Sequence, residues 1–163
     1  MPFSFFIRLL CDINLIPQHL LVCLYNGLHI RPDYHFDMAR PGVALYGVGP
    51  VPGKPNPMVQ VIKLQGKIVQ VRDVDTPQTV GYGATHQVEG PGRIATVAVG
   101  YADGYLRSLS NKGTGYVGDT PVPVVGRVSM DLITLDVTGV PEHLCATGTL
   151  VDLIGPKNPV DQV

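Results

Sequence analysis

Glycine and proline interrupt this sequence every few residues, and their spacing limits the length of any regular element. The chain has 19 glycines and 15 prolines among 163 residues. Short runs rich in β-branched residues and bounded by Gly or Pro are typical of strands joined by turns. No amphipathic pattern longer than about ten residues favours a helix after residue 57. The sequence therefore predicts a mostly β fold, an antiparallel barrel or sandwich, with strand-like runs at 58–74, 93–101, 113–118, 120–139 and 148–155.

The first of these runs, VQVIKLQGKIVQV, contains an irregularity. Val59, Val61 and Leu64 give way at Gly66 to Ile68, so the period of two is not kept throughout. A glycine in a strand, together with a break in this period, often marks a bend or a β-bulge. We therefore expect the strand to bend near Gly66.

The segment 31–57 has a different character. It begins with a turn-like stretch, continues through an apolar run at 43–46 that we interpret as a strand, and ends in a stretch rich in Pro and Gly at 49–57. Such stretches are typical of linkers. We therefore place a domain boundary there.

Composition excludes several functional classes. With 45% apolar residues, 15% charged residues and a formal net charge of −1, the chain predicts a globular domain without the basic footprint of nucleic-acid or anionic-membrane binding. The three cysteines form no CxxC pair and the five histidines form no HxH or HxxxH pair, so neither a disulfide framework nor a metal site is expected. Arg8 and Asp12 interrupt the apolar N-terminal stretch, and we predict no targeting segment or membrane span. A cytoplasmic location is the expectation.

Four short motifs remain: RPG at 40–42, GYGAT at 81–85, GYADGY at 100–105 and GRVSMD at 126–131. None is a dinucleotide-binding fingerprint, since the third glycine is missing, and no GxSxG elbow is present. Taken singly, each motif also has a purely structural interpretation, with tyrosines in a barrel wall, an arginine at the surface and a methionine in the core.

Taken together and in this order, the motifs resemble alanine racemase, a family of enzymes that use pyridoxal phosphate. The likeness runs from about Arg31 to the end of the chain. It implies an N-terminal (β/α)8 barrel that holds the cofactor, a mostly β C-terminal domain, and a homodimer in which that domain reaches the partner's active site.

The resemblance also implies roles for individual residues. Tyr82 would take the α-proton from L-alanine, and the glycines beside it would let the backbone bring the phenol close to a flat cofactor. The Met130 amide would bind the substrate carboxylate. Arg40 would hold the pyridine nitrogen of pyridoxal phosphate, and the amides of Gly42 and Val43 its phosphate. Residues at and around the entrance of the site would be Tyr101, Arg107, Arg127 and Asp131.

The match covers part of the family's length. We expect residues 1–25 to be an unassigned segment unlike the family, 26–57 to be a remnant of the cofactor-binding barrel with its linker, and 58–163 to be the β domain, truncated at its C-terminus. The lysine that links to the cofactor lies in the family's barrel, and no lysine of this chain matches its motif. We therefore expect an incomplete racemase that is inactive alone.

Two functions remain open at this point. The first is interconversion of L- and D-alanine by the parent enzyme, which supplies D-alanine for peptidoglycan. The second is a non-catalytic β module, either an orphan binding domain or the partner chain of a separate barrel.

Overall fold

The computed structural model describes residues 22–24, 38–40, 42–49, 51, 53–83 and 86–163. The chain divides into two compact units, Met1–Val61 and Ile62–Val163. Among the described residues there are strands and short 3-10 helices but no α-helix. In chain order these elements are β1 (Val22–Leu24), β2 (Met38–Arg40), η2 (Val43–Tyr46), β3 (Leu64–Val74), β4 (Gln78–Val80), β5 (His86–Val88), β6 (Gly92–Ala98), η3 (Tyr101–Asp103), η4 (Arg107–Leu109), β7 (Thr114–Val117), β8 (Thr120–Pro123), β9 (Ile133–Asp136), η5 (Glu142–Leu144), β10 (Leu150–Ile154) and η6 (Val160–Gln162).

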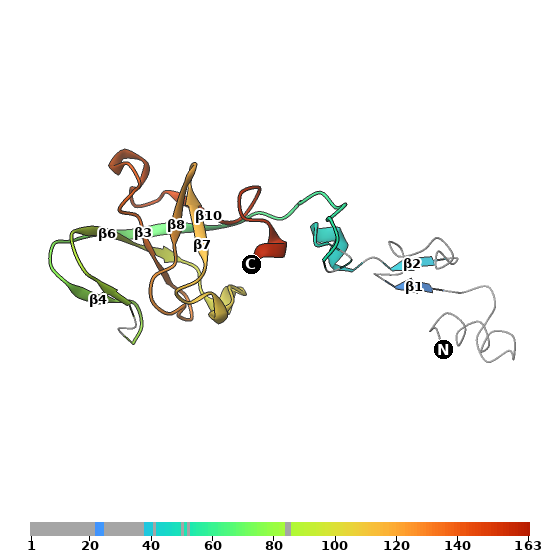
Figure 1. The fold of residues 1–163 in the computed structure, drawn as a ribbon, viewed down its shortest axis with the longest axis horizontal. Coiled ribbons are helices and arrows are strands. Elements are labelled where there is room, and N and C mark those ends of the chain that lie inside the picture. The colour runs from blue at the N-terminus through green and yellow to red at the C-terminus, as the bar shows by residue number, and fades with distance from the viewer. Residues whose placement is uncertain (1–21, 25–37, 41, 50, 52, 84–85) are drawn as a thin grey trace, which may run out of the picture. The chain divides into compact units, whose positions relative to one another are not determined.

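Six strands of the second unit form one antiparallel sheet in the order β8-β7-β10-β3-β6-β9 (Figure 1). Its two edges meet, because Val124 next to β8 bridges Leu135 of β9. The Val125 amide also donates to the Thr134 carbonyl at 2.9 Å. The sheet is therefore nearly closed, which leaves little unpaired edge. The predicted antiparallel β fold is confirmed.

Apolar residues that alternate along these strands fill the interior of the sheet. Burial of each such side chain stabilises the fold by about 1.5–3 kcal/mol. The largest fully buried side chains come from all around the sheet and from the segments next to it: Ile68, Val74, Val97, Val122, Val128, Ile133, Leu135, Val137, Val140, Val151 and Leu153.

The expected irregularity in the first strand lies three residues beyond Gly66. The pairing of β3 with β6 shifts between Ile68 and Gln70, so Val69 is an extra residue on β3. This shift moves the inward side of the strand from Ile68 to Val71, and both residues contact the core. Gly66 itself is required by packing, since a Cβ there would lie 2.4 Å from Cγ1 of Val97.

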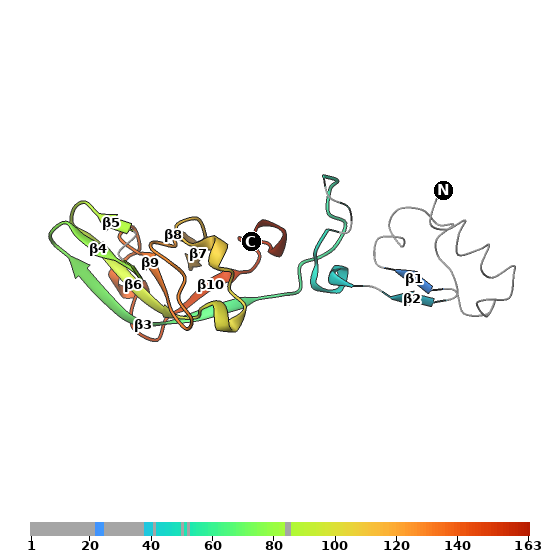
Figure 2. The same cartoon turned by 90° about the horizontal axis from the view of Figure 1, so that it is seen from below.

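A small hairpin extends the second unit beyond β3. Strands β4 and β5 pair with each other, Gln78 with Val88 and Val80 with His86 (Figure 2). Val80 belongs to a second apolar cluster, distinct from the main core, in which it packs with Val74, Ile94 and Val125. Val80, the last residue of β4, thus packs the hairpin against the six-stranded sheet directly before the GYGAT motif.

In the first unit, β1 and β2 pair in parallel, Val22 with Met38 and Leu24 with Arg40. The strand expected at 43–46 is wrong, because these residues form the 3-10 helix η2. The helix follows from its flanks: the Leu45 amide donates to the Gly42 carbonyl at 3.1 Å, and Gly47, at φ +88°, ends the turn in the left-handed conformation that favours glycine.

The predicted domain limits stay a prediction. The division between the two units falls after Val61, and the linker was placed at 49–57. Of the segment 1–25, only Val22–Leu24 belongs to the described residues. Of the expected barrel remnant, residues 26–37, 41, 50 and 52 lie outside them.

Candidate active site

The motifs of the second unit fall in three loop segments, of which the one between β8 and β9 contacts the other two. The turn 81–83 follows β4, the segment 99–111 follows β6 and contains η3 and η4, and the segment 124–132 joins β8 to β9. The strand-like run predicted at 120–139 is therefore two strands with this loop between them. The sheet order brings the loops together because β6 and β9 are neighbours.

The segment with Tyr101 is held against the segment with Met130 by backbone hydrogen bonds. The Tyr101 amide donates to the Ser129 carbonyl and the Ala102 amide to the Met130 carbonyl, both at 3.0 Å. The approach is so close that a Cβ on Gly100 would lie 2.1 Å from the Met130 carbonyl oxygen. The glycine of GYADGY is thus required by contact with a second motif.

Ser110 and Asn111, at the end of the segment 99–111, hydrogen-bond to the start of GRVSMD. The Asn111 amide donates to the Gly126 carbonyl at 3.2 Å, and the Gly126 amide donates to Oδ1 of Asn111 at 2.6 Å. Next to it, the Val128 amide donates to Oγ of Ser110 at 3.0 Å. Three hydrogen bonds therefore fix the backbone on both sides of Arg127.

Two glycines bring the turn of Tyr82 against this clasped backbone. Gly81 and Gly126 have φ values of +80° and +82°. A Cβ on Gly81 would lie 2.9 Å from Cα of Gly126 and 3.3 Å from the Arg127 amide nitrogen. No side chain fits at this contact, and Tyr82 follows it directly.

The predicted side chains of these loops face solvent. Tyr82 is 71% exposed, Met130 53% and Tyr101 38%, and Arg127 and Asp131 are exposed as well. The Tyr82 side chain therefore lies at the surface of the second unit.

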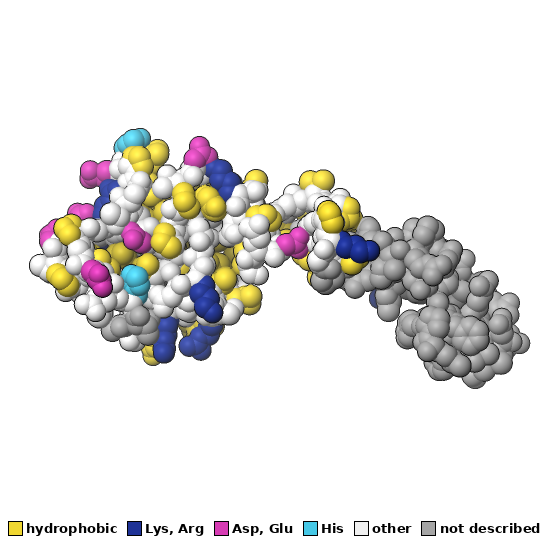
Figure 3. Space-filling view, in the orientation of Figure 1, with side chains coloured by type: hydrophobic (Ala, Val, Ile, Leu, Met, Phe, Trp, Pro, Cys, Tyr) yellow, Lys and Arg dark blue, Asp and Glu magenta, His cyan; other side chains and the backbone are white. Residues whose placement is uncertain are grey.

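A cation–π contact links two residues predicted at the entrance. The exposed guanidinium carbon of Arg107 lies 5.1 Å from the centre of the Tyr101 ring. Side chains of both charge signs are scattered over the visible face of the second unit (Figure 3). The structure thus brings Tyr82, Tyr101, Arg107, Arg127 and Met130 into one set of touching loops.

Burial separates the second tyrosine of GYADGY from the first. Tyr105 is 2% exposed, and burial raises its pKa to about 12. Burial also raises the pKa of the Cys145 thiol, an effect that the nearby charge of Arg93 opposes. Both groups are neutral parts of the core at neutral pH and are poor candidates for reagents.

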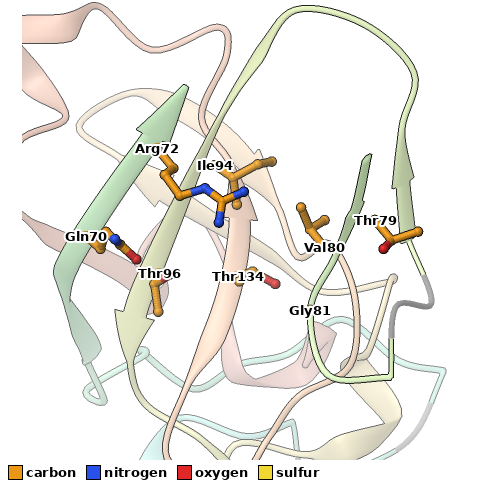
Figure 4. Close-up of a pocket in the computed structure, with 8 residues that line it drawn as sticks. All are labelled: Gln70, Arg72, Thr79, Val80, Gly81, Ile94, Thr96 and Thr134. Atoms are coloured by element: carbon orange, nitrogen blue, oxygen red, sulfur yellow. The ribbon is translucent and has the colours of Figure 1, made fainter. Parts of the chain in front are cut away.

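A pocket of about 160 Å³ lies beside the site turn, between the sheet and the hairpin (Figure 4). Arg72 reaches from β3 across it, and its Nη2 donates to Oε1 of Gln78 at 2.7 Å. This bond links β3 to β4 and so helps to place the strand that leads into Gly81. The lining residues are Gln70, Arg72, Thr79, Val80, Gly81, Ile94, Thr96 and Thr134.

The residues predicted to hold a cofactor lie in the first unit. Arg40 ends β2 and is exposed. Among the described residues, no backbone carbonyl accepts from the amides of Gly42 and Val43, which precede and begin η2. The turn itself is braced, since Nδ2 of Asn56 donates to the Gly47 carbonyl at 2.8 Å.

Sequence reasoning missed the residues that support the site. Ser110 and Asn111 make the clasp around Arg127, and Arg72 ties the hairpin to the sheet. One signal was present: the Asn-Lys-Gly sequence at 111–113 is rich in residues that adopt turns, and Asn111 has φ +55°. Nothing in the sequence indicated its partner, fifteen residues away.

Two kinds of feature are absent from the part of the chain that the structure describes. No three His, Cys, Asp or Glu side chains gather there closely enough to hold a metal ion. None of its helices has the length and apolar character needed to cross a membrane.

Comparison with known proteins places these loops in a family. The family model described as alanine racemase, C-terminal domain, matches residues 61–163. Alanine racemase of Rhodospirillum rubrum is 57% identical over 136 residues, which are 83% of this chain and 36% of that protein.

Solved structures agree with this match. Alanine racemase from Bartonella henselae with covalently bound pyridoxal phosphate has a TM-score of 0.82 at 37% identity, covering 98% of this chain and 44% of that one. Alanine racemase from Bacillus anthracis with bound L-Ala-P has a TM-score of 0.77 at 30% identity, covering 93% and 40%. This chain thus spans between 36% and 44% of the length of these relatives. It belongs to the alanine racemase family, whose C-terminal domain it contains over residues 61–163.

Proposed function

We propose that this chain acts within an alanine racemase that interconverts L- and D-alanine with pyridoxal phosphate as cofactor. Membership of the family supports the reaction, and the relatives with bound L-Ala-P and with pyridoxal phosphate support the substrate and the cofactor. Because the chain spans less than half of those relatives, the proposal concerns the complete enzyme.

The observation that carries the proposal is the position of Tyr82. Its side chain is 71% exposed, on a turn whose preceding glycine is wedged against Gly126. In this proposal the Tyr82 phenolate oxygen takes the α-proton of L-alanine and returns it when the reaction runs the other way. A proton acceptor must sit within hydrogen-bond reach of its proton, and a turn held by backbone contacts provides that placement better than a free loop.

Met130 binds the substrate carboxylate through its backbone amide in this proposal. Its carbonyl accepts from Ala102, whereas no carbonyl among the described residues accepts from its amide. An amide held in this way is an oriented donor for an anionic oxygen. Tyr101, Arg107, Arg127 and Asp131 line the entrance and orient the substrate.

Cofactor contacts come from the first unit. Arg40 faces the pyridine nitrogen, and the amides of Gly42 and Val43, which donate to no backbone carbonyl among the described residues, hold the phosphate. Pyridoxal phosphate, when bound, withdraws the electrons of the bond broken at the α-carbon. The part of the chain described here thus offers a guanidinium and two amides that fit this group.

The complete enzyme acts in the cytoplasm as a homodimer and supplies D-alanine for peptidoglycan. Solvent exposure of Tyr82, Tyr101 and Met130 supports the dimer. A reacting group needs water excluded around it, so another surface must cover these side chains. In a dimer, the partner subunit's barrel provides that cover.

The test uses a hybrid in which the aligned segment of the Rhodospirillum rubrum racemase is replaced by this chain's residues, with Tyr82→Phe introduced. The two enantiomers have equal free energy in water, so kcat/KM must fall equally in both directions, by about 10²- to 10⁴-fold for loss of a general base. Exchange of the α-hydrogen with deuterium oxide distinguishes the two faces. L-alanine should stop exchanging, while D-alanine, which loses its proton on the opposite face, should continue.

Tyr101→Phe is the matched control. Removal of a hydroxyl at the entrance should act mainly on KM, because such a group contributes positioning. Unchanged exchange of L-alanine in Tyr82→Phe, or its loss in Tyr101→Phe alone, would show that the two tyrosines have been assigned wrongly.

A further inference from the structure

We infer that Asn111 is a positioning residue for the Tyr82 turn, acting through the backbone of Gly126. The inference rests on the proposed role of Tyr82 and adds a residue whose side chain lies outside the motifs that mark the family. It follows from three successive contacts in the second unit.

Asn111 adopts a conformation that few residues other than glycine accept. It is the one described non-glycine residue with positive φ, at +55°. Asparagine tolerates this region better than most residues, and its short amide side chain can bond nearby backbone. In this conformation Asn111 presents both its backbone N–H and its side-chain oxygen to the same residue, Gly126.

The pair of hydrogen bonds fixes the peptide groups of Gly126. The Asn111 amide donates to the Gly126 carbonyl at 3.2 Å, and the Gly126 amide donates to Oδ1 of Asn111 at 2.6 Å. Gly126 is buried and has φ +82°. Glycine has wide conformational freedom, so two bonds from one residue restrict a backbone that would otherwise move.

Gly126 also contacts the turn that carries Tyr82. A Cβ on Gly126 would lie 2.9 Å from Cα of Gly81 and 3.1 Å from the Val80 carbonyl oxygen. The two backbones therefore touch with no side chain between them. Within the described residues, no backbone hydrogen bond reaches Gly81, Tyr82 or Gly83 from another part of the chain. Among the described residues, contact with Gly126 thus restrains this turn, and Asn111 restrains Gly126.

Asn111→Gly isolates the side chain. Glycine accepts φ +55° and keeps the backbone N–H, so the change removes the side chain with its Oδ1 acceptor and leaves the backbone donor in place. Asn111→Asp restores an acceptor oxygen at the same place. Asn158→Ala is the matched control, because Nδ2 of Asn158 donates to the carbonyls of Thr114 and Leu153 at 2.9 and 2.7 Å, away from the turn.

The first measurement needs no activity. In amide ¹H–¹⁵N spectra of the 163-residue chain, Asn111→Gly should shift the signals of Gly81, Tyr82 and Gly83, and Asn158→Ala should leave them in place. Unmoved signals of this turn in a folded Asn111→Gly chain would overturn the inference.

The second measurement uses the hybrid racemase. Asn111→Gly should slow α-hydrogen exchange of L-alanine by about 10- to 100-fold, the range produced when a reacting group is misplaced by about 1 Å. Exchange of D-alanine and KM should stay unchanged, Asn111→Asp should restore the L-alanine rate, and Asn158→Ala should slow neither enantiomer. Added to Tyr82→Phe, Asn111→Gly should have no further effect on L-alanine.

Equal slowing of both enantiomers, or failure of Asn111→Asp to restore the rate, would assign Asn111 a general structural role and overturn the inference. If Tyr82→Phe alone leaves L-alanine exchange intact, the proposed role of Tyr82 fails, and the amide signals then decide by themselves whether Asn111 positions the turn.

Discussion

Tyr101 and Tyr105 lie four residues apart in one motif and have opposite environments. Tyr101 is 38% exposed beneath the Arg107 guanidinium, whereas Tyr105 is 2% exposed and close to Gly113. A tyrosine phenol in water has a pKa of about 10, and burial raises the pKa of Tyr105 to about 12. At the scale of single residues, burial therefore decides which tyrosine can meet a substrate.

The raised pKa of Tyr105 predicts a loss of stability at high pH. Below pH 10 the phenol is protonated in both the folded and the unfolded chain, and its contribution is intact. As the pH rises from 10 through 12, the unfolded chain releases this proton first, so the free energy of unfolding falls, by on the order of 2 kcal/mol for a shift of this size. Urea unfolding below and above pH 10 should show a smaller decline in Tyr105→Phe than in the unaltered chain. An equal fall in the free energy of unfolding of the two proteins would show that Tyr105 does not cause this loss of stability.

At the scale of elements, closure of the sheet depends on β9. Leu135 of β9 is fully buried, pairs with Ala95 of β6 and bridges Val124 on the other edge. Leu135→Ala should lower the free energy of unfolding by about 2–5 kcal/mol, because a cavity forms where both edges of the sheet meet.

Leu150 on β10 provides the comparison for this prediction. It is a leucine in the same sheet but 49% exposed, and Leu150→Ala should cost only about 0.5 kcal/mol. Chemical denaturation of both variants measures the difference. Similar costs for the two leucines would mean that closure at Leu135 adds no stability.

At the scale of the whole molecule, the second unit has its own core. All members of both apolar clusters lie between Leu64 and Leu153, and the unit begins at Ile62. We therefore expect residues 62–163 to fold alone, with the circular dichroism and amide spectra that these residues have in the full chain.

A shorter fragment, residues 62–149, tests whether this core requires β10. Strand β10 comes last in sequence yet lies between β7 and β3 in the sheet. Residues 62–149 lack it and should be unfolded, because β7 and β3 then lose the strand that pairs with both of them, and Val151 and Leu153 of β10 are missing from the core. A folded 62–149 piece, or an unfolded 62–163 piece, would contradict this view of the core.

The local sequence predicted strands correctly where β-branched and apolar residues recur along a run. The runs predicted at 93–101 and 148–155 contain β6 and β10, because β-branched residues between Gly and Pro suit a pleated, half-buried surface. The run 43–46 is also apolar, but its flanking glycines and the Gly42–Leu45 hydrogen bond make it a 3-10 turn. Composition alone does not carry that distinction.

What the sequence by itself determined is the β class, the strand-like runs and the motifs of the racemase family, because these depend on neighbours in the chain. Only the tertiary structure decided which tyrosine is exposed, that Gly81 meets Gly126, and that Asn111 holds Gly126 across fifteen residues. The physical reason is that burial and backbone contact depend on sheet order, and the order β8-β7-β10-β3-β6-β9 arises from pairing between strands far apart in the chain.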